Sequence, residues 1–208
     1  MTNAHERKKQ PEVVRRNLLD CAAKLAAEQG VAALSVQAVA DAAGVTKGGL
    51  FHHFPSKQVL LEAVMTDLLA ALDNEIDALI SQDREASGSF TRAYVNAVFS
   101  DRGRDSGRQW AAISVSMVGE PSLRRMWNSW IEGRLVRHKE TDDGVVLEMV
   151  RLAADGIWFA DLLADGWQSG WRQGGSEGPD DRPDEEGYVT MNTAVFTYGA
   201  LVAAIVCE

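Results

Sequence analysis

Two short helices joined by a glycine are the feature that most constrains the fold of this chain. The first helix is expected over residues 36–43 and the second over residues 47–54, with Gly44 in the turn between them. A serine or threonine that can cap a helix N-terminus precedes each helix, and a proline follows the second. Two helices arranged in this way form a helix-turn-helix, whose second helix can lie in the major groove of DNA. We therefore predict this motif at residues 36–54.

The rest of the chain also has a helical pattern. Apolar residues recur at steps of three and four, and proline is scarce over long stretches. We expect an all-α fold, with helices over residues 11–29, 36–43, 47–54, 57–80, 90–99, 107–118, 121–138 and 143–164. The last apolar segment, residues 189–206, is compatible with a helix or a strand.

Charge is distributed unevenly along the chain, whose formal net charge is −9. Through Lys57 there are eight Lys or Arg residues and five Asp or Glu residues, whereas the remainder carries 13 basic and 25 acidic residues. A cationic N-terminal part on an acidic body suits a protein that brings one end to phosphate groups. Chance scatter of surface charge would produce the same totals, so the charge supports the motif without establishing it.

Several classes of protein are disfavoured by what the sequence lacks. No apolar run reaches the ~20 residues of a membrane span, and no apolar stretch follows the N-terminal charges as it would in a signal peptide. Cys21 and Cys207 alone provide neither a disulfide framework nor a metal cluster, so we expect a cytoplasmic protein. Motifs such as G-x-S-x-G, the P-loop, H-E-x-x-H and C-x-x-C are absent, so we expect no enzyme, no cofactor and no membrane partner.

The outward face of the second helix carries the side chains that suit a DNA groove: Lys47, Gly48, Phe51 and His52. Lys47 can reach a guanine edge or a phosphate, and Phe51 can contact a thymine methyl group. Gly48 and Gly49 each cost roughly 1 kcal/mol relative to alanine in a helix, which suggests that the backbone approaches DNA closely there. We expect phosphate contacts from five further residues: Ser35, Gln37, Thr46, His53 and Lys57.

Two other interpretations of this segment remain open. His52 and His53 could form a metal pair, but adjacent helical residues point about 100° apart and no Cys or carboxylate completes a site. We therefore expect no metal. A structural three-helix domain without DNA binding is the other alternative.

Residues 34–57 read LSVQAVADAAGVTKGGLFHHFPSK and resemble the N-terminal domain of the TetR family of transcriptional repressors. The recognition helix of that family has the form G-x-x-x-x-G-L-[YF]-x-H-F, followed by a polar residue or proline and a lysine. In this chain the pattern stands from Gly44 to Lys57, and the resemblance extends over about residues 13–64. Phe51 stands where the family more often has tyrosine, so the phosphate contact of that hydroxyl would be missing.

The resemblance implies that the C-terminal two-thirds of the chain forms a helical body that dimerises and encloses a small-molecule pocket. Ten residues are candidates to line it, although core packing explains any single one equally well: Phe99, Trp110, Ile113, Met117, Met126, Trp127, Trp130, Met149, Asp155 and Phe159. Residues 143–164 resemble a helix that builds the dimer interface in the family, with Val146, Val150, Ala153, Gly156, Ile157 and Ala160 as its candidates.

Two charged residues near these candidates have open roles. Asp155 could pair with a cationic ligand or with Arg151, four residues earlier. Arg134 shares a helix face with Trp127 and Trp130, where it could extend to solvent or meet an anionic group.

We accordingly expect a flexible segment at residues 1–10, a helix-turn-helix domain at 11–56, and a helical regulatory and dimerisation domain at 57–164. Residues 165–208 depart from the family's pattern, with an acidic loop and an apolar end. The expected function is a ligand-responsive repressor that binds a palindromic DNA operator as a homodimer and is released by a hydrophobic or aromatic effector. The alternative is a helical adaptor that holds a protein partner without an effector response.

Overall fold

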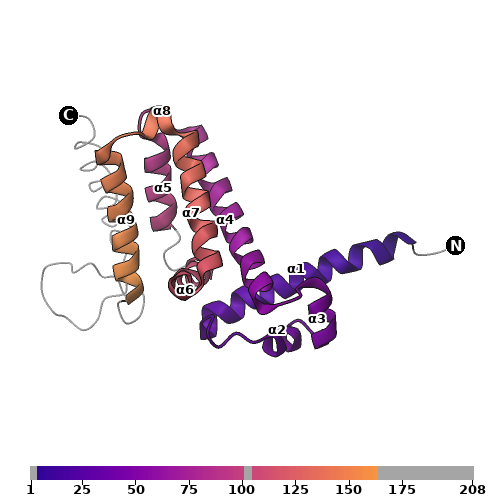
Figure 1. Cartoon of the computed structure of the whole chain (residues 1–208). Helices are drawn as coiled ribbons and strands as arrows, with labels where there is room; N and C mark the ends of the chain where they lie inside the picture. Colours follow the sequence, from indigo (N-terminus) through magenta and orange to yellow (C-terminus); the bar gives the residue numbers. More distant parts are fainter. Residues whose placement is uncertain (1–3, 101–104, 164–208) are drawn as a thin grey trace, which may run out of the picture. The chain divides into compact units, whose positions relative to one another are not determined.

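The computed structural model of the chain describes residues 4–100 and 105–163. Over these residues the chain is all-α, with nine helices and no strand (Figure 1). The predicted parts at residues 165–208 and 189–206 lie outside this description. None of the described helices combines the length and hydrophobicity needed to cross a membrane.

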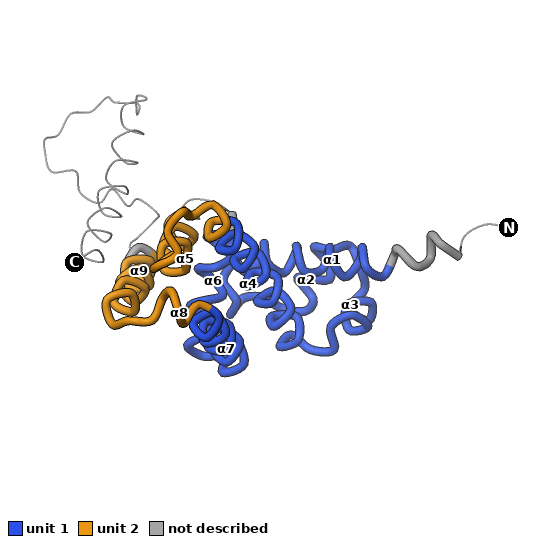
Figure 2. The backbone as a smooth tube through the Cα atoms, turned by 90° about the horizontal axis from the view of Figure 1, so that it is seen from above, with its two compact units in different colours: residues 1–78, 101–137 blue, residues 79–100, 138–208 orange. Residues whose placement is uncertain are grey.

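The helices fall into two compact units (Figure 2). The first contains residues 1–78 and 101–137 and the second contains residues 79–100 and 138–208. The predicted boundary between residues 56 and 57 lies within the first unit. Helix α4 (Lys57–Gln82) begins in the first unit, where its apolar residues pack against those of the helix-turn-helix.

The first unit contains α1 (Ala4–Gln29), α2 (Val36–Ala42), α3 (Lys47–His53), most of α4, α6 (Asp105–Gly119) and α7 (Pro121–Arg137). Local signals set most of these bounds. The side chains of Ser35 and Thr46 accept hydrogen bonds from the backbone N–H of Ala38 (3.0 Å) and Gly49 (3.1 Å) at the starts of α2 and α3. Gly44 has a φ of 68° in the turn between them, a backbone conformation that favours glycine. The predicted helix-turn-helix is confirmed.

Helix α1 begins at Ala4, not at Pro11. The flexible segment predicted over residues 1–10 overlaps this helix at residues 4–10, and residues 1–3 lie outside the description. Residues 6–10 are Glu, Arg, Lys, Lys and Gln, all strong helix formers, and Pro11 stands inside the helix.

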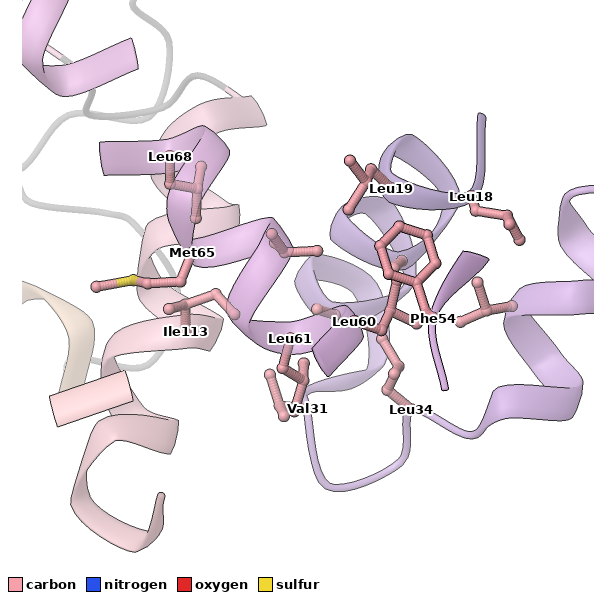
Figure 3. Packing of buried hydrophobic residues seen from close by; sticks show 14 of the residues in the cluster. Leu18, Leu19, Val31, Leu34, Phe54, Leu60, Leu61, Met65, Leu68 and Ile113 are labelled. Atoms are coloured by element: carbon pink, nitrogen blue, oxygen red, sulfur yellow. The ribbon is translucent and has the colours of Figure 1, made fainter. Parts of the chain in front are cut away.

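One hydrophobic core joins the helices of the first unit. Leu18 and Leu19 of α1, Leu50 of α3 and Leu60 of α4 are buried in it, together with Ile113 of α6. Figure 3 shows part of this cluster, with Phe54 and Ile113 among its labelled members. The helix-turn-helix is thus stabilised by helices on both sides of it in the sequence.

The second unit contains α5 (Ser89–Ser100), α8 (Lys139–Asp142) and α9 (Val145–Leu163). Asp142 is 3% exposed, and its carboxylate accepts hydrogen bonds from the backbone N–H groups of Phe90 (3.2 Å) and Thr91 (2.7 Å). A carboxylate that binds the free N–H groups in the first turn of a helix stabilises that helix. The short helix α8, which the periodicity did not predict, holds this carboxylate at the start of α5.

Candidate nucleic-acid interface

The inner faces of α2 and α3 fix the orientation of the helix-turn-helix. Val39 and Ala40 of α2 and Leu50 of α3 have no exposed surface. The backbone N–H of Val45 donates to the carbonyl of Ala40 (3.0 Å), which closes the turn. The side-chain amide of Asn17 in α1 donates to the carbonyl of Ala43 (3.0 Å) at the C-terminus of α2. The two helices therefore have little freedom to move relative to each other or to α1.

The outer face of α3 carries the four residues expected in a DNA groove, and all four are exposed: Lys47, Gly48, Phe51 and His52. The ammonium nitrogen of Lys47 lies 5.8 Å from the centroid of the Phe51 ring, within the range of a cation–π interaction. Phe51 is 39% exposed although it is a large apolar side chain. An exposed aromatic ring beside a lysine is suited to contact with a base or sugar and a phosphate.

Several of the residues expected to contact phosphate groups also make contacts within the chain. Ser35 and Thr46 use an oxygen lone pair for their caps, which leaves each hydroxyl free to donate. Lys57 donates to the carbonyl of Val31 (3.0 Å) and is half-buried. His53 is half-buried, with its ring centroid 5.4 Å from that of His52.

One basic residue of α1 lies against the C-terminal end of α3 and was not among the predicted site residues. The guanidinium carbon of Arg15 in α1 lies 5.0 Å from the centroid of the Phe54 ring, at the C-terminal end of α3. Its neighbour Arg16 forms ion pairs with Asp20 and Asp67, both at 2.6 Å. The excess of positive charge in the N-terminal part of the sequence indicated that further basic residues could contact DNA. Only the structure shows that Arg15 lies against Phe54 whereas Arg16 is paired with two carboxylates.

Six of the ten residues expected in a ligand pocket belong to the first unit and lie in or against its core: Trp110, Ile113, Met117, Met126, Trp127 and Trp130. The ring centroids of Trp110 and Trp127 are 6.0 Å apart with an edge-to-face arrangement, and those of Trp127 and Trp130 are 5.1 Å apart. We call these six residues the aromatic cluster. Ile113 is fully buried, and the other five are partly buried against the core that contains α1 and α4.

Arg134 lies beside this cluster and binds two acidic residues of α4. It is 2% exposed, and its guanidinium pairs with Asp73 at 2.5 Å and also with Asp77. The indole N–H of Trp130 donates to the same Asp73 carboxylate at 2.7 Å. Arg134 could have extended to solvent or met an anionic group, and the structure shows the second of these roles. Its contacts join α7 to α4.

In the second unit, Asp155 is bound by a partner from α5. The hydroxyl of Tyr94 donates to its carboxylate at 2.5 Å. Burial raises the pKa of Asp155 above its ordinary value, against the opposing effects of this hydrogen bond and of the nearby Arg151 charge. Burial, followed by the Asp155 charge, also raises the pKa of Tyr94. Arg151 itself is buried and donates to the Thr91 hydroxyl at 2.5 Å. Asp155 therefore serves the packing of α5 against α9, where Phe99 of α5 is half-buried.

The outward face of α9 is apolar and exposed. Residues 145, 149, 152, 156 and 159 follow one another at alternating steps of four and three, and their exposed members include Met149 (63%), Leu152 (61%) and Phe159 (49%). Met149 and Phe159 are thus on an open helix face, which does not support their prediction as pocket residues. The predicted interface residues are split: Val146, Ala153 and Gly156 are exposed, Val150 and Ile157 are half-buried, and the side chain of Ala160 lies outside the description.

Two family models match this chain. One is described as "Bacterial regulatory proteins, tetR family" and matches residues 18–64. The other is described as "Tetracyclin repressor-like, C-terminal domain" and matches residues 88–170. The first match contains α2, α3 and the turn between them, and the second contains α5–α9.

Curated relatives include transcriptional regulators. The chain is 41% identical over 86 residues to the HTH-type transcriptional repressor KstR2 of Rhodococcus jostii, a match that covers 40% of this chain and 39% of KstR2. It is 28% identical over 170 residues to the HTH-type transcriptional regulator BetI of Burkholderia thailandensis, covering 74% of this chain and 85% of BetI. The match thus spans less than half the length of the KstR2 relative.

Solved structures share the fold. A transcriptional regulator from Streptomyces coelicolor A3(2) matches with a TM-score of 0.61 and 18% identity, over 73% of this chain and 88% of that one. The multidrug binding protein EbrR, complexed with malachite green, matches with a TM-score of 0.59 and 23% identity, over 72% and 87% of the two chains. The capped helix-turn-helix, the two matching family models and this shared fold agree: the chain belongs to the TetR family of bacterial transcriptional regulators.

Proposed function

We propose that this protein is a ligand-responsive transcriptional repressor that binds a palindromic DNA operator as a homodimer through α3. The observation that carries the proposal is the exposed face of α3, where Lys47 and Phe51 lie together on a helix that caps and core contacts hold in place. In this proposal Lys47, Gly48, Phe51 and His52 enter the major groove. Phosphate contacts come from Ser35, Gln37, Thr46, His53, Lys57 and Arg15, and the backbone at Gly49 lies close to the DNA.

Replacing Lys47 by alanine tests this assignment. Each lysine that neutralises a phosphate releases counterions, so affinity depends on salt in proportion to the number of such contacts. We expect K47A to weaken binding to duplex DNA and to reduce the slope of log affinity against log salt by about 1. Fluorescence anisotropy with labelled duplex over a salt series measures both quantities.

The matched control is Lys139→Ala, which removes an exposed lysine of α8 in the second unit. Its slope should equal that of the wild-type protein. Equal slopes for K47A and the wild type would contradict a role for Lys47 in DNA binding. Absence of salt-dependent DNA binding by the wild-type protein would contradict the proposed function as a whole.

The aromatic cluster is the proposed site of effector action. Three tryptophans and two partly buried methionines provide adaptable apolar surface for a hydrophobic or aromatic molecule. The cluster shares its core with α1 and α4, so a bound molecule would favour one packing of these helices over another. We expect the resulting loss of DNA affinity to be about 1–3 kcal/mol. Titrating the protein–DNA complex with a panel of aromatic compounds that includes malachite green, the ligand in the EbrR structure, tests this step.

The exposed face of α9 is the proposed dimer interface. It comprises Val145, Val146, Met149, Leu152, Ala153, Gly156 and Phe159, and their spacing matches the seam of two packed helices. Contiguous exposed apolar surface of this kind marks an interaction site. Binding to a palindromic operator would require two α3 helices about one DNA turn (~34 Å) apart.

Replacing Leu152 by glutamate is expected to convert the dimer into a monomer, because each interface would then bury two carboxylates without partners. Sedimentation equilibrium measures the association. Val136→Glu is the control, since Val136 is also exposed (77%) but lies on α7. A dimeric L152E variant, or a monomeric wild-type protein, would rule out this interface.

A further inference from the structure

Asp41 is the acidic residue of the helix-turn-helix. Between Ser35 and Lys57 the sequence contains a single Asp or Glu, and it is Asp41, near the end of α2. Its side chain is exposed, so it serves no buried polar contact. A carboxylate on a surface that approaches phosphate groups opposes binding through charge repulsion. If Asp41 contributes to DNA binding, its contribution must therefore offset the repulsion between its carboxylate and the phosphates.

The contact of Asp41 indicates what that contribution is. The side-chain nitrogen of Gln37 lies 2.8 Å from a carboxylate oxygen of Asp41, one helical turn away on the exposed face of α2. A carboxylate has acceptors only, so the amide of Gln37 must turn its NH₂ group toward Asp41. This leaves the amide oxygen and the second N–H of Gln37 directed away from that contact, in a defined orientation.

The remaining donor and acceptor match one particular partner. A glutamine recognises adenine in the major groove by accepting from the N6 amino group and donating to N7. A phosphate offers acceptors only and would lie beside the Asp41 charge, whereas a base edge is neutral. We propose that Asp41 is a positioning residue that orients Gln37 to read an adenine. This inference rests on the proposed DNA binding and moves Gln37 from a phosphate contact to a base contact.

The test uses the full chain and a pool of duplex DNA with a randomised core. Bound sequences are selected with the wild-type protein and with Q37A, D41A and the double variant, and the base preference at each position is compared. We expect the wild type to prefer an A·T pair at one position of each half-site. Q37A and D41A should both lose that preference, by roughly five- to hundredfold. The double variant should lose no more than either single variant, because the two residues act as one unit.

Glu28→Ala is the matched control. Glu28 is an exposed carboxylate of α1 that also faces a residue four positions away, Lys24, at 3.9 Å. Its removal changes the net charge by the same amount and should leave every base preference intact. Circular dichroism checks that all variants retain the helical fold.

The outcomes separate the inference from the proposed function. If the wild-type protein enriches no sequence, sequence-specific DNA binding fails and the inference fails with it. If the wild type enriches a site and D41A retains the full preference, binding all sequences more tightly, then Asp41 contributes charge alone. That result would overturn the positioning role while leaving the proposed function intact.

Discussion

Replacing both Asp73 and Asp77 by alanine is expected to lower the free energy of unfolding by about 2–4 kcal/mol. The guanidinium of Arg134 is 2% exposed and pairs with both carboxylates. Leaving a buried charge without partners costs about 3–5 kcal/mol, and the better helix propensity of alanine returns up to ~0.7 kcal/mol at each position. Urea unfolding followed by circular dichroism measures the change.

Two comparisons isolate the cause of this loss. Asp67→Ala removes a carboxylate of the same helix whose partner, Arg16, is 60% exposed, so it should cost at most about 1 kcal/mol. Adding Arg134→Met to the double variant removes the unpaired charge and should recover most of the stability. A double variant that unfolds like the wild type, or a triple variant that is no better than the double, would contradict the assignment of Arg134 as a buried charge held by α4.

Replacing Gly48 by alanine is expected to change stability and DNA binding in opposite directions. A Cβ atom at this position would lie 4.0 Å from the Thr46 hydroxyl oxygen and meet nothing closer, so the free protein can accept it. Helix α3 should gain up to about 1 kcal/mol from the better helix propensity of alanine. If the backbone at Gly48 approaches DNA as proposed, the added methyl group should weaken binding roughly tenfold to hundredfold, the scale of one lost base-pair contact.

The controls for this variant use two other helical glycines. A Cβ atom at Gly133 in α7 would have no neighbour within 4 Å, so Gly133→Ala should raise stability without changing DNA affinity. A Cβ at Gly49 would lie 3.3 Å from the Thr46 hydroxyl oxygen, so Gly49→Ala should disturb the cap of α3. Unchanged DNA affinity in G48A, measured by fluorescence anisotropy beside thermal unfolding, would refute close approach at this position.

The helices of this protein could be predicted from the sequence because their signals are local. Ser35 and Thr46 accept the expected cap hydrogen bonds, and Gly44 has the positive φ that its place in the turn requires. Helix α9 shows where such reasoning stops, because apolar residues lie on both its packed and its open faces. Buried Leu147 and exposed Leu152 have the same side chain, and only the contact with α5 distinguishes them.

The polar contacts between distant segments could not be predicted. Arg134 is 61 residues from Asp73, and Tyr94 is 61 residues from Asp155. Periodicity assigns each of these residues to a helix face but does not state which acid or hydroxyl lies opposite. For this reason Asp155 was expected to pair with a ligand or with Arg151, whereas its hydrogen-bond partner is the Tyr94 hydroxyl.

The single core of the first unit has a consequence for how this protein can evolve. Trp110, Met117 and Trp127 pack on the same cluster of buried residues as Leu18 of α1 and Leu50 of α3. A substitution that reshapes the aromatic cluster for a new molecule therefore also changes the support of the DNA-reading helix. Adaptation to a new signal and retention of the old operator are thus coupled traits, and variants that change one should carry compensating changes in α1 or α4.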